Sequence, residues 1–155
     1  NIVRVTSDCP LVDPEIIDKT IELFLKEKSD YASNNLKKTF PHGLDVEVFT
    51  FKALKETYIN ATNKTDKEHV TQYMRRKTEK FKLNNLSSNV NLSDIRITID
   101  EQEDFFLIKK IADTFGKDTT YKDITNFFLK FPELKKLNQS AKKRHKNYNK
   151  TKEII

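Results

Sequence analysis

Apolar and polar positions divide this chain into strands and helices that follow one another along the sequence. β-Branched residues dominate positions 2–6 and 95–99, a composition that favours buried strands. Apolar residues recur at helical spacing over 14–28 and again over 101–115. Strands that alternate with helices are typical of an α/β domain, so we expect a mixed, mostly parallel sheet flanked by helices.

Weaker patterns predict the remaining elements. Residues 44–49 alternate with period two, which predicts a strand that carries Asp45 and Glu47 on one face. Two carboxylates on one strand face require either an exposed edge or a polar cleft. Asp66 can cap a helix that runs to about residue 76. Shorter strands are predicted at 31–33 and 81–86, and further helices at 51–59 and 121–131.

Composition limits the class of protein. The 155 residues suffice for one domain with a real core, and no apolar run approaches the roughly 18 residues that indicate a membrane span. A single cysteine excludes an internal disulfide and a cysteine-based zinc site, which fits a cytoplasmic location. The two glycines, Gly43 and Gly116, are too few for a P-loop or a dinucleotide-binding glycine motif.

The net charge of +6 comes from the C-terminal end of the chain. Eight of the 29 basic residues lie between Lys135 and Lys152, where no acidic residue occurs. The rest of the chain carries 21 basic and 23 acidic residues, so its body is not basic. This distribution argues against a general nucleic-acid-binding face. The basic tail is either a solvated helix or a contact for RNA, a membrane or an acidic partner.

Asp8 and Asp100 are the strongest candidates for chemistry. Each ends a β-branched run and is followed by residues that open a helix. Carboxylates at the C-terminal ends of buried strands lie at the crevice where α/β sheets bind ligands. Two such carboxylates could share a hard cation such as Mg²⁺. The alternative is that both residues are ordinary helix N-caps, where aspartate is favoured.

Two further features have open interpretations. Glu68 and His69 lie in the helix predicted from Asp66, and the helical repeat places His69 on one face with Gln72, Tyr73 and Arg76. That face is either solvated or part of a site. Cys9 follows Asp8 and is either a small packed side chain or a nucleophile that would need a nearby base.

Four stretches in order carry a resemblance to a known family. They are RVTSDCPLVDPE at 4–15, FPHGLDVEVF at 40–49, EHVT at 68–71 and ITIDEQEDF at 97–105. With these motifs, residues 1–115 resemble the cytidylyltransferases that activate acidic sugars, and more narrowly the branch of spore coat polysaccharide biosynthesis protein F. The resemblance implies a Rossmann-like, nucleotide-diphospho-sugar transferase fold. It also implies transfer of CMP from CTP to a sugar acid with release of pyrophosphate, in surface polysaccharide biosynthesis.

The resemblance also implies roles for particular residues. Asp8 and Asp100 match the aspartates that bind Mg²⁺ in the family, and both are expected to be catalytic. The stretch from Asp45 to Glu47 matches the acceptor side of the site. Contacts with the substrates are further expected from Arg4, Glu68, His69 and Arg75. The family resemblance implies a homodimer as well.

This chain departs from the family pattern at several positions. Ser7 stands where glycine is usual, His42 where aspartate is common, and Gln72 and Gln102 where proline is usual. Family members also carry an upstream half with a Gly/Arg/Lys-rich loop that cradles the CTP phosphates, and no such loop occurs here. We therefore expect residues 1–116 to be the C-terminal portion of a cytidylyltransferase domain, followed by a helical, Lys-rich extension over 117–155.

Two other functions remain open at this point. The first is a glycosyltransferase with a similar nucleotide-sugar-binding fold, which would release a nucleotide and form a glycosidic bond. The second is a non-catalytic remnant that acts by association with a partner.

Overall fold

The computed structural model describes residues 1–116 and 118–140, which belong to two compact units. Neither unit is continuous in sequence. The first comprises residues 1–6, 14–40 and 45–91, and the second comprises 7–13, 41–44 and the chain from residue 92 onward. The predicted division into 1–116 and 117–155 stays a prediction, and most of the predicted basic tail lies outside the described residues.

The first unit contains a four-stranded sheet in the order β1-β3-β2-β4. β3 pairs antiparallel with both β1 and β2, and only β2 and β4 pair in parallel. The prediction of a mixed sheet is therefore confirmed, but its mostly parallel character is wrong. The reason is that no helix lies between β2 and β3, and a connection without a crossover joins antiparallel neighbours. The strand bounds are Ile2–Arg4 for β1, Tyr31–Ser33 for β2, Glu47–Phe49 for β3 and Leu83–Asn85 for β4.

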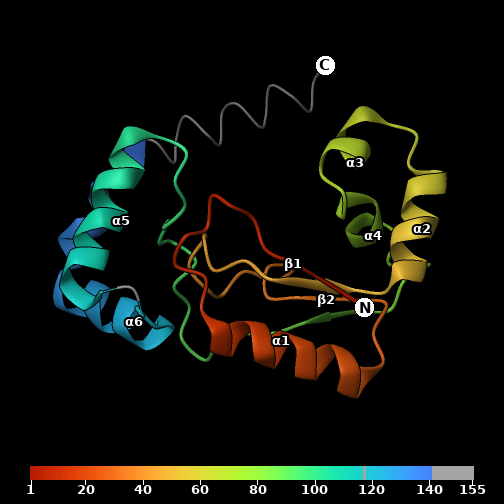
Figure 1. Cartoon of the computed structure of the whole chain (residues 1–155), viewed down its shortest axis with the longest axis horizontal. Helices are drawn as coiled ribbons and strands as arrows, with labels where there is room; N and C mark the ends of the chain where they lie inside the picture. The colour runs from red at the N-terminus through yellow and green to blue at the C-terminus, as the bar shows by residue number, and fades with distance from the viewer. Residues whose placement is uncertain (117, 141–155) are drawn as a thin grey trace. The chain divides into compact units, whose positions relative to one another are not determined.

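Helix α1 (Pro14–Glu27) packs on β2, β3 and β4 and runs alongside the sheet (Figure 1). Its start at a proline matches the prediction, because proline suits the first helical position. Helix α2 (Phe51–Asn60) is capped by Thr50, whose Oγ1 accepts a hydrogen bond from the backbone N of Ala53 at 2.9 Å. The core of this unit joins strand and helix residues: Tyr31, Phe49, Ala53, Ala61, Tyr73, Met74 and Phe81.

The helix predicted from Asp66 to residue 76 is wrong in one respect, because the structure breaks it into two short helices. These are α3 (Lys64–Glu68) and α4 (Gln72–Arg76). Asn63, not Asp66, caps α3, and its Oδ1 accepts from the backbone N of Asp66 at 2.7 Å. Between the helices Val70 has a φ of 54°, which no helix can continue through. His69 therefore does not share a continuous helical face with the residues of α4.

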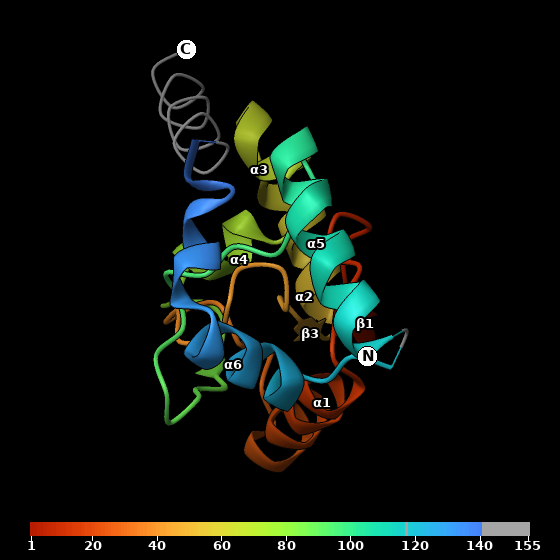
Figure 2. The same ribbon diagram turned by 90° about the vertical axis from the view of Figure 1, so that its left-hand side faces the viewer.

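The second unit contains α5 (Gln102–Phe115), α6 (Tyr121–Lys130) and the 3₁₀-helix η1 (Pro132–Lys136). Helices α5 and α6 pack together (Figure 2). The rings of Phe115 and Phe127 meet edge-to-face with centroids 5.9 Å apart. The backbone N of Gly116 donates to Ala112 at the end of α5, as predicted for a C-cap. In the part of the chain that the structure describes, no helix has the length and apolar content needed to cross a bilayer.

Residues 95–99 were predicted as a strand, but the structure shows a buried extended segment that forms only one isolated parallel bridge, between Arg96 and His42. The backbone N of Ile97 donates to the carbonyl of His42 at 2.7 Å. Ile95 and Ile97 are almost fully buried, so the apolar pattern identified burial correctly. A strand requires a continuous ladder, and this segment has too few neighbouring backbone partners to form one.

The backbone at Gly43 leads to a prediction about the stability of the second unit. An added Cβ at Gly43 would lie 2.5 Å from the carbonyl oxygen of Ile97, and the residue has a φ of 114°. At Gly116 the φ is 82°, but no heavy atom lies within 4 Å of an added Cβ. We expect Gly43→Ala to lower the free energy of unfolding by about 2–3 kcal/mol, and Gly116→Ala by about 1 kcal/mol. Urea unfolding of both variants measures the difference; equal losses would show that the contact with Ile97 has no effect.

A second prediction concerns Thr57 on α2. Its hydroxyl is buried and has no hydrogen-bond partner among the described residues. A buried polar group without a partner costs free energy, and valine has nearly the same shape as threonine. We expect Thr57→Val to raise the free energy of unfolding by about 1 kcal/mol. Urea titration monitored by circular dichroism measures this change, and a loss of stability would show that the hydroxyl does have a partner.

Candidate functional site

Asp8 and Asp100, the two predicted metal ligands, lie in the second unit on segments that are joined by a hydrogen bond. The backbone N of Ile99 donates to the carbonyl oxygen of Asp8 at 2.8 Å, so the residue before Asp100 runs beside Asp8. Neither aspartate caps a helix. The N-cap of α5 is Glu101, and α1 begins at Pro14. The alternative that both are ordinary N-caps is therefore wrong.

Asp100 is held by a buried arginine. Arg96 uses Nε and Nη2 to donate to the two carboxylate oxygens of Asp104, each at 3.1 Å. The same Nη2 also donates to Oδ2 of Asp100, and Thr98 Oγ1 donates to that oxygen at 3.1 Å. Oδ1 of Asp100 accepts no hydrogen bond from the described residues. One oxygen of this carboxylate is thus fixed by two donors, while the other has no hydrogen-bond donor in the described part of the chain.

The pair of Arg96 and Asp104 is fully enclosed by polar partners. Asn138 donates from Nδ2 to Oδ1 of Asp104 at 2.7 Å and to the carbonyl of Arg96 at 3.0 Å. Burial alone would raise the pKa of the Asp104 carboxyl, but hydrogen bonds from Arg96, Asn138 and the backbone of Asp100 outweigh it and lower the pKa. Burial likewise opposes the charge on Arg96, yet its two carboxylate partners raise its pKa. Both groups therefore stay charged at neutral pH.

The oxygens at this site suit a hard cation. The Asp8 side chain is half-buried, and its Oδ1 has only a weak contact with Sγ of Cys9 at 3.8 Å. The Asp100 side chain is 33% exposed. The described residues contain no group of three or more histidine, cysteine or acidic side chains placed to hold a metal. Asp8 and Asp100 supply carboxylate oxygens, the donor type that Mg²⁺ prefers when water and phosphate fill its remaining positions.

Glu47, predicted on the acceptor side, is a buried hub in the first unit. It is only 4% exposed, and β3, which it opens, is a central strand of the sheet. Its Oε1 accepts from the hydroxyls of Tyr31 at 2.6 Å and Thr71 at 2.7 Å, and Oε2 pairs with Arg4. Asp45 precedes the strand and is half-buried, so the prediction that both acids share one strand face is wrong.

The hydroxyl of Tyr31 is bound tightly in this hub. Burial, together with the charge of Glu47 and the hydrogen bond to it, raises the pKa of Tyr31 far above its ordinary value. The phenol is therefore a permanent donor to Glu47 at every physiological pH. With Arg4 on the second oxygen, Glu47 has a charged partner and two neutral donors, the set of partners that a buried carboxylate requires.

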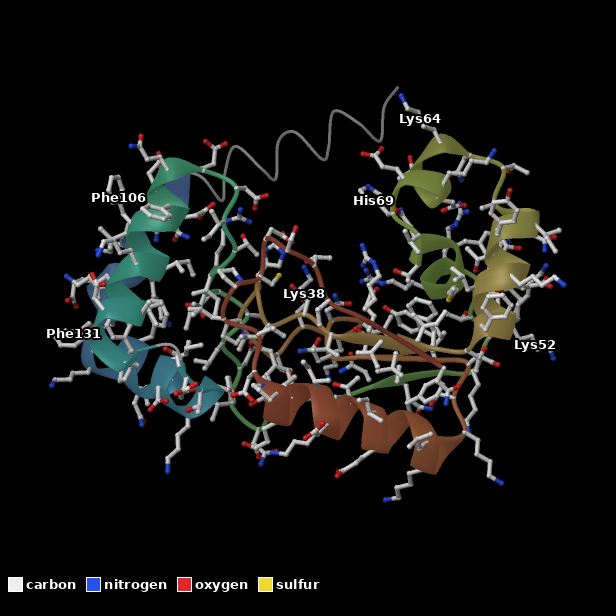
Figure 3. The ribbon with its side chains drawn as sticks, in the orientation of Figure 1. Lys38, Lys52, Lys64, His69, Phe106 and Phe131 are labelled. Carbon is white, nitrogen blue, oxygen red and sulfur yellow. The ribbon has the colours of Figure 1, made fainter. Side chains whose placement is uncertain are left out.

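Arg75, Glu68 and His69 are the more accessible of the predicted contacts in the first unit. Arg75 is half-buried, and its Nη2 lies 3.5 Å from the carbonyl oxygen of Asn35. No acidic side chain pairs with Arg75 among the described residues. Glu68 ends α3 and is exposed. His69 caps the helix and is exposed as well (Figure 3). The structure thus groups Arg4 with Glu47, leaves Arg75 without a counter-ion in the described part of the chain, and presents Glu68 and His69 to solvent.

Several residues of these clusters were not predicted as functional. Arg96 is a charged residue within a run of isoleucines, and this interruption of a buried segment was the available signal. Asp104 occupies the position of a capping-box acid in α5, and a second role as partner of Arg96 has no local signal. Tyr31 and Thr71 are distant in sequence from Glu47 and are joined to it only by the fold.

Comparisons with known proteins place this chain in a family. The model of a family described as cytidylyltransferase matches residues 1–154. An uncharacterized protein of Methanocaldococcus jannaschii is 37% identical over 155 residues, which are 98% of this chain and 62% of that protein. Spore coat polysaccharide biosynthesis protein SpsF of Bacillus subtilis is 31% identical over 119 residues, which are 75% of this chain and 48% of SpsF.

A solved structure agrees with these relatives. The structure of a cytidylyltransferase from Leptospira borgpetersenii serovar Hardjo-bovis matches with a TM-score of 0.81 and 33% identity, over 86% of this chain and 57% of that one. The α/β nucleotidyltransferase fold is thereby confirmed. This chain spans about half to three fifths of the length of these proteins.

The family match also bears on the predicted boundaries. It runs to residue 154, so it does not support a resemblance that ends near residue 116, nor the interpretation of residues 1–116 as a C-terminal portion only. With a family model that matches nearly all of its residues, the chain belongs to the cytidylyltransferase family.

Proposed function

We propose that this protein is an Mg²⁺-dependent cytidylyltransferase that transfers CMP from CTP to a sugar acid and releases pyrophosphate. The observation that carries the proposal is the hydrogen bond between Ile99 and Asp8, which sets two partly open carboxylates on adjoining segments in a chain of this family. The name of SpsF, a relative in spore coat polysaccharide biosynthesis, supports a sugar acceptor and a role in surface polysaccharides.

The proposed reaction is a displacement at the α-phosphorus of CTP. The acceptor hydroxyl loses its proton to solvent as its oxygen forms a bond to this phosphorus, the bond to the bridging oxygen of the β-phosphate breaks, and pyrophosphate leaves. A bound Mg²⁺ would supply charge neutralisation of the phosphates. Asp8 and Asp100 would hold the ion through their open oxygens. Arg96 would fix the orientation of Asp100 through the hydrogen bond to Oδ2.

The acceptor side is proposed in the first unit. Arg75 is an arginine without an acidic partner among the described residues, and its planar guanidinium matches a carboxylate by two parallel hydrogen bonds. We propose that it binds the carboxylate of the sugar acid. Arg4, Asp45, Glu68 and His69 are the further proposed contacts on this side. Glu47 belongs to the same proposed region, although its burial separates it from direct contact with a substrate.

The test is to supply the full-length protein with CTP, Mg²⁺ and a panel of sugar acids. Pyrophosphate release that depends on the acceptor, together with a CMP–sugar product seen by mass spectrometry, is the expected result. A free nucleotide with a new glycosidic bond would favour the glycosyltransferase alternative. Absence of both CTP binding and turnover would favour a non-catalytic role. A cytoplasmic location and a homodimer belong to the same proposal, and light scattering of the purified protein tests the dimer.

A further inference from the structure

The turn between α3 and α4 contains a strained residue. Val70 has a φ of 54°, in the left-handed region that a β-branched residue rarely adopts. Such a conformation costs on the order of 1–3 kcal/mol, so it persists only where its surroundings enforce it. Strained backbone of this kind clusters at functional sites, so the turn is a candidate for a functional role.

The residue after Val70 shows what enforces the turn. Thr71 is 2% exposed, and its hydroxyl donates to Oε1 of Glu47 at 2.7 Å. The other flank is held by α3, since the backbone N of His69 donates to the carbonyl of Thr65 at 3.0 Å. Val70 is therefore fixed between two anchored neighbours and cannot relax without breaking one of these bonds.

Glu47 can serve as an anchor because its own position is fixed. It sits at the start of a central strand and pairs in register with Arg4 and Ser33 on the neighbouring strands. The hydroxyl of Tyr31 binds the same Oε1 at 2.6 Å, and Arg4 binds Oε2. With three donors and 4% exposure, this carboxylate has little capacity left for a substrate. The position of Glu47 instead suits it to hold Thr71 in place.

Both ends of the anchored turn carry residues from the proposed acceptor side. His69 lies immediately before Val70, is exposed, and projects from the end of α3 (Figure 3). On the other end, the backbone N of Arg75 donates to the carbonyl of Thr71 at 3.1 Å, in the first turn of α4. The bond from Thr71 to Glu47 therefore holds the start of α4 and Arg75, and together with the bond from His69 to Thr65 it holds the turn that follows His69.

We infer that Glu47 and Thr71 are positioning residues, which hold the strained turn and through it fix the sugar-acid contacts of His69 and Arg75. The inference rests on the proposed function and changes the role of Glu47 from a substrate contact to a support. Tyr31 contributes by saturating the same carboxylate oxygen as Thr71. Loss of the anchor is expected to weaken acceptor binding while leaving CTP binding intact.

The decisive variant is Thr71→Val, which removes the hydroxyl and keeps the shape of the side chain. Its matched control is Thr57→Val, because Thr57 is a buried threonine of the same unit whose hydroxyl has no partner among the described residues. In Thr71→Val we expect the KM for the sugar acid to rise about tenfold, with the KM for CTP within about twofold of wild type. Thr71→Ser keeps the hydroxyl and is expected to restore the acceptor KM.

A second readout needs no substrate. Amide hydrogen exchange at residues 70–72 is expected to be about tenfold faster in Thr71→Val than in wild type, and unchanged in Thr57→Val. If Thr71→Val does not fold, Tyr31→Phe can be used in its place, because it removes the other hydroxyl that binds Oε1 of Glu47. In Tyr31→Phe we expect a smaller rise in the KM for the sugar acid.

The two readouts separate the inference from the proposed function. Absence of turnover in the wild-type protein would overturn the proposed function, while exchange would still decide whether the anchor exists. Equal exchange in Thr71→Val and wild type would overturn the anchor. An active protein in which Thr71→Val and Thr57→Val share the wild-type acceptor KM would overturn the positioning role, since a purely structural hydroxyl lowers stability without shifting KM.

Discussion

Replacing Asp8 or Asp100 with alanine is expected to lower the turnover number for pyrophosphate release by at least about a hundredfold. Each substitution removes one of the two carboxylates proposed to hold Mg²⁺. A tenfold loss corresponds to about 1.4 kcal/mol, so the expected effect is about 2.7 kcal/mol or more of transition-state stabilisation.

The measurement is steady-state pyrophosphate release over a range of Mg²⁺ concentrations, together with calorimetric titration of the ion. Asp113→Asn is the matched control, because Asp113 is an exposed aspartate on α5 that forms an ion pair with Lys109. It should leave turnover unchanged. Full turnover in both Asp8→Ala and Asp100→Ala would refute the metal assignment.

The loss should not come from unfolding. Asp100 is partly exposed, and Arg96 keeps its two hydrogen bonds to Asp104 when Asp100 is removed. We therefore expect the free energy of unfolding of Asp100→Ala to stay within about 1 kcal/mol of wild type. Because stability is expected to change little, a loss of turnover in Asp100→Ala would report a change at the metal site and not unfolding.

Local sequence signals predicted the helices with strong periodicity. Helices α1, α5 and α6 have a stripe of apolar residues long enough to bury one face, and proline or glycine marks their ends at Pro14 and Gly116. The strand predicted at 31–33 has the bounds of β2, whereas those predicted at 2–6, 44–49 and 81–86 are two or three residues longer than β1, β3 and β4, and 95–99 is not a strand. Burial, which the β-branched pattern reports, extends beyond the ladder of hydrogen bonds that defines a strand.

The failures come from interactions that no local pattern reports. The sequence near Val70 gives no sign that the predicted helix is interrupted there. The interruption goes with the hydrogen bond from Thr71 to Glu47, whose partners are 24 residues apart in sequence. The same bond shows why alternation alone leaves two environments open for Glu47, an exposed edge or a polar cleft. Alternation gives the face of a residue, but only tertiary contacts decide whether that face meets solvent or a buried cluster.

For the candidate site, the sequence predicts the pair of aspartates, whose role stays a prediction, but gives no sign of Arg96 beside Asp100. Asp8 and Asp100 follow β-branched runs, and the structure brings their segments together. Arg96 was missed because its role depends on Asp104 and Asn138, which reach it only after the second unit has folded. The residues that hold a site come from many parts of a chain, whereas the ligands themselves lie in short motifs.

Replacing Arg96 with methionine is expected to lower the free energy of unfolding by about 3–5 kcal/mol at pH 7. Arg96 is 3% exposed and its partner Asp104 is fully buried, so the substitution leaves a buried carboxylate without its counter-ion. Lys109→Met is the matched control, because it breaks an exposed pair with Asp113 and is expected to cost less than about 1 kcal/mol. Urea unfolding gives both values, and equal losses would contradict the importance of the buried pair.

The pH dependence of this loss has a definite sign. In wild type, hydrogen bonds to Arg96, Asn138 and the backbone outweigh burial and lower the pKa of Asp104 below its ordinary 3.8. Its contribution to stability is therefore complete above the ordinary pKa and declines as the pH falls through the lowered one. In Arg96→Met, burial without the guanidinium raises that pKa, so the variant gains stability as the carboxyl is protonated. The difference between wild type and variant should thus be smaller at pH 4 than at pH 7. An equal difference at both pH values would show that Asp104 keeps its charge without Arg96, held by Asn138 and the backbone alone.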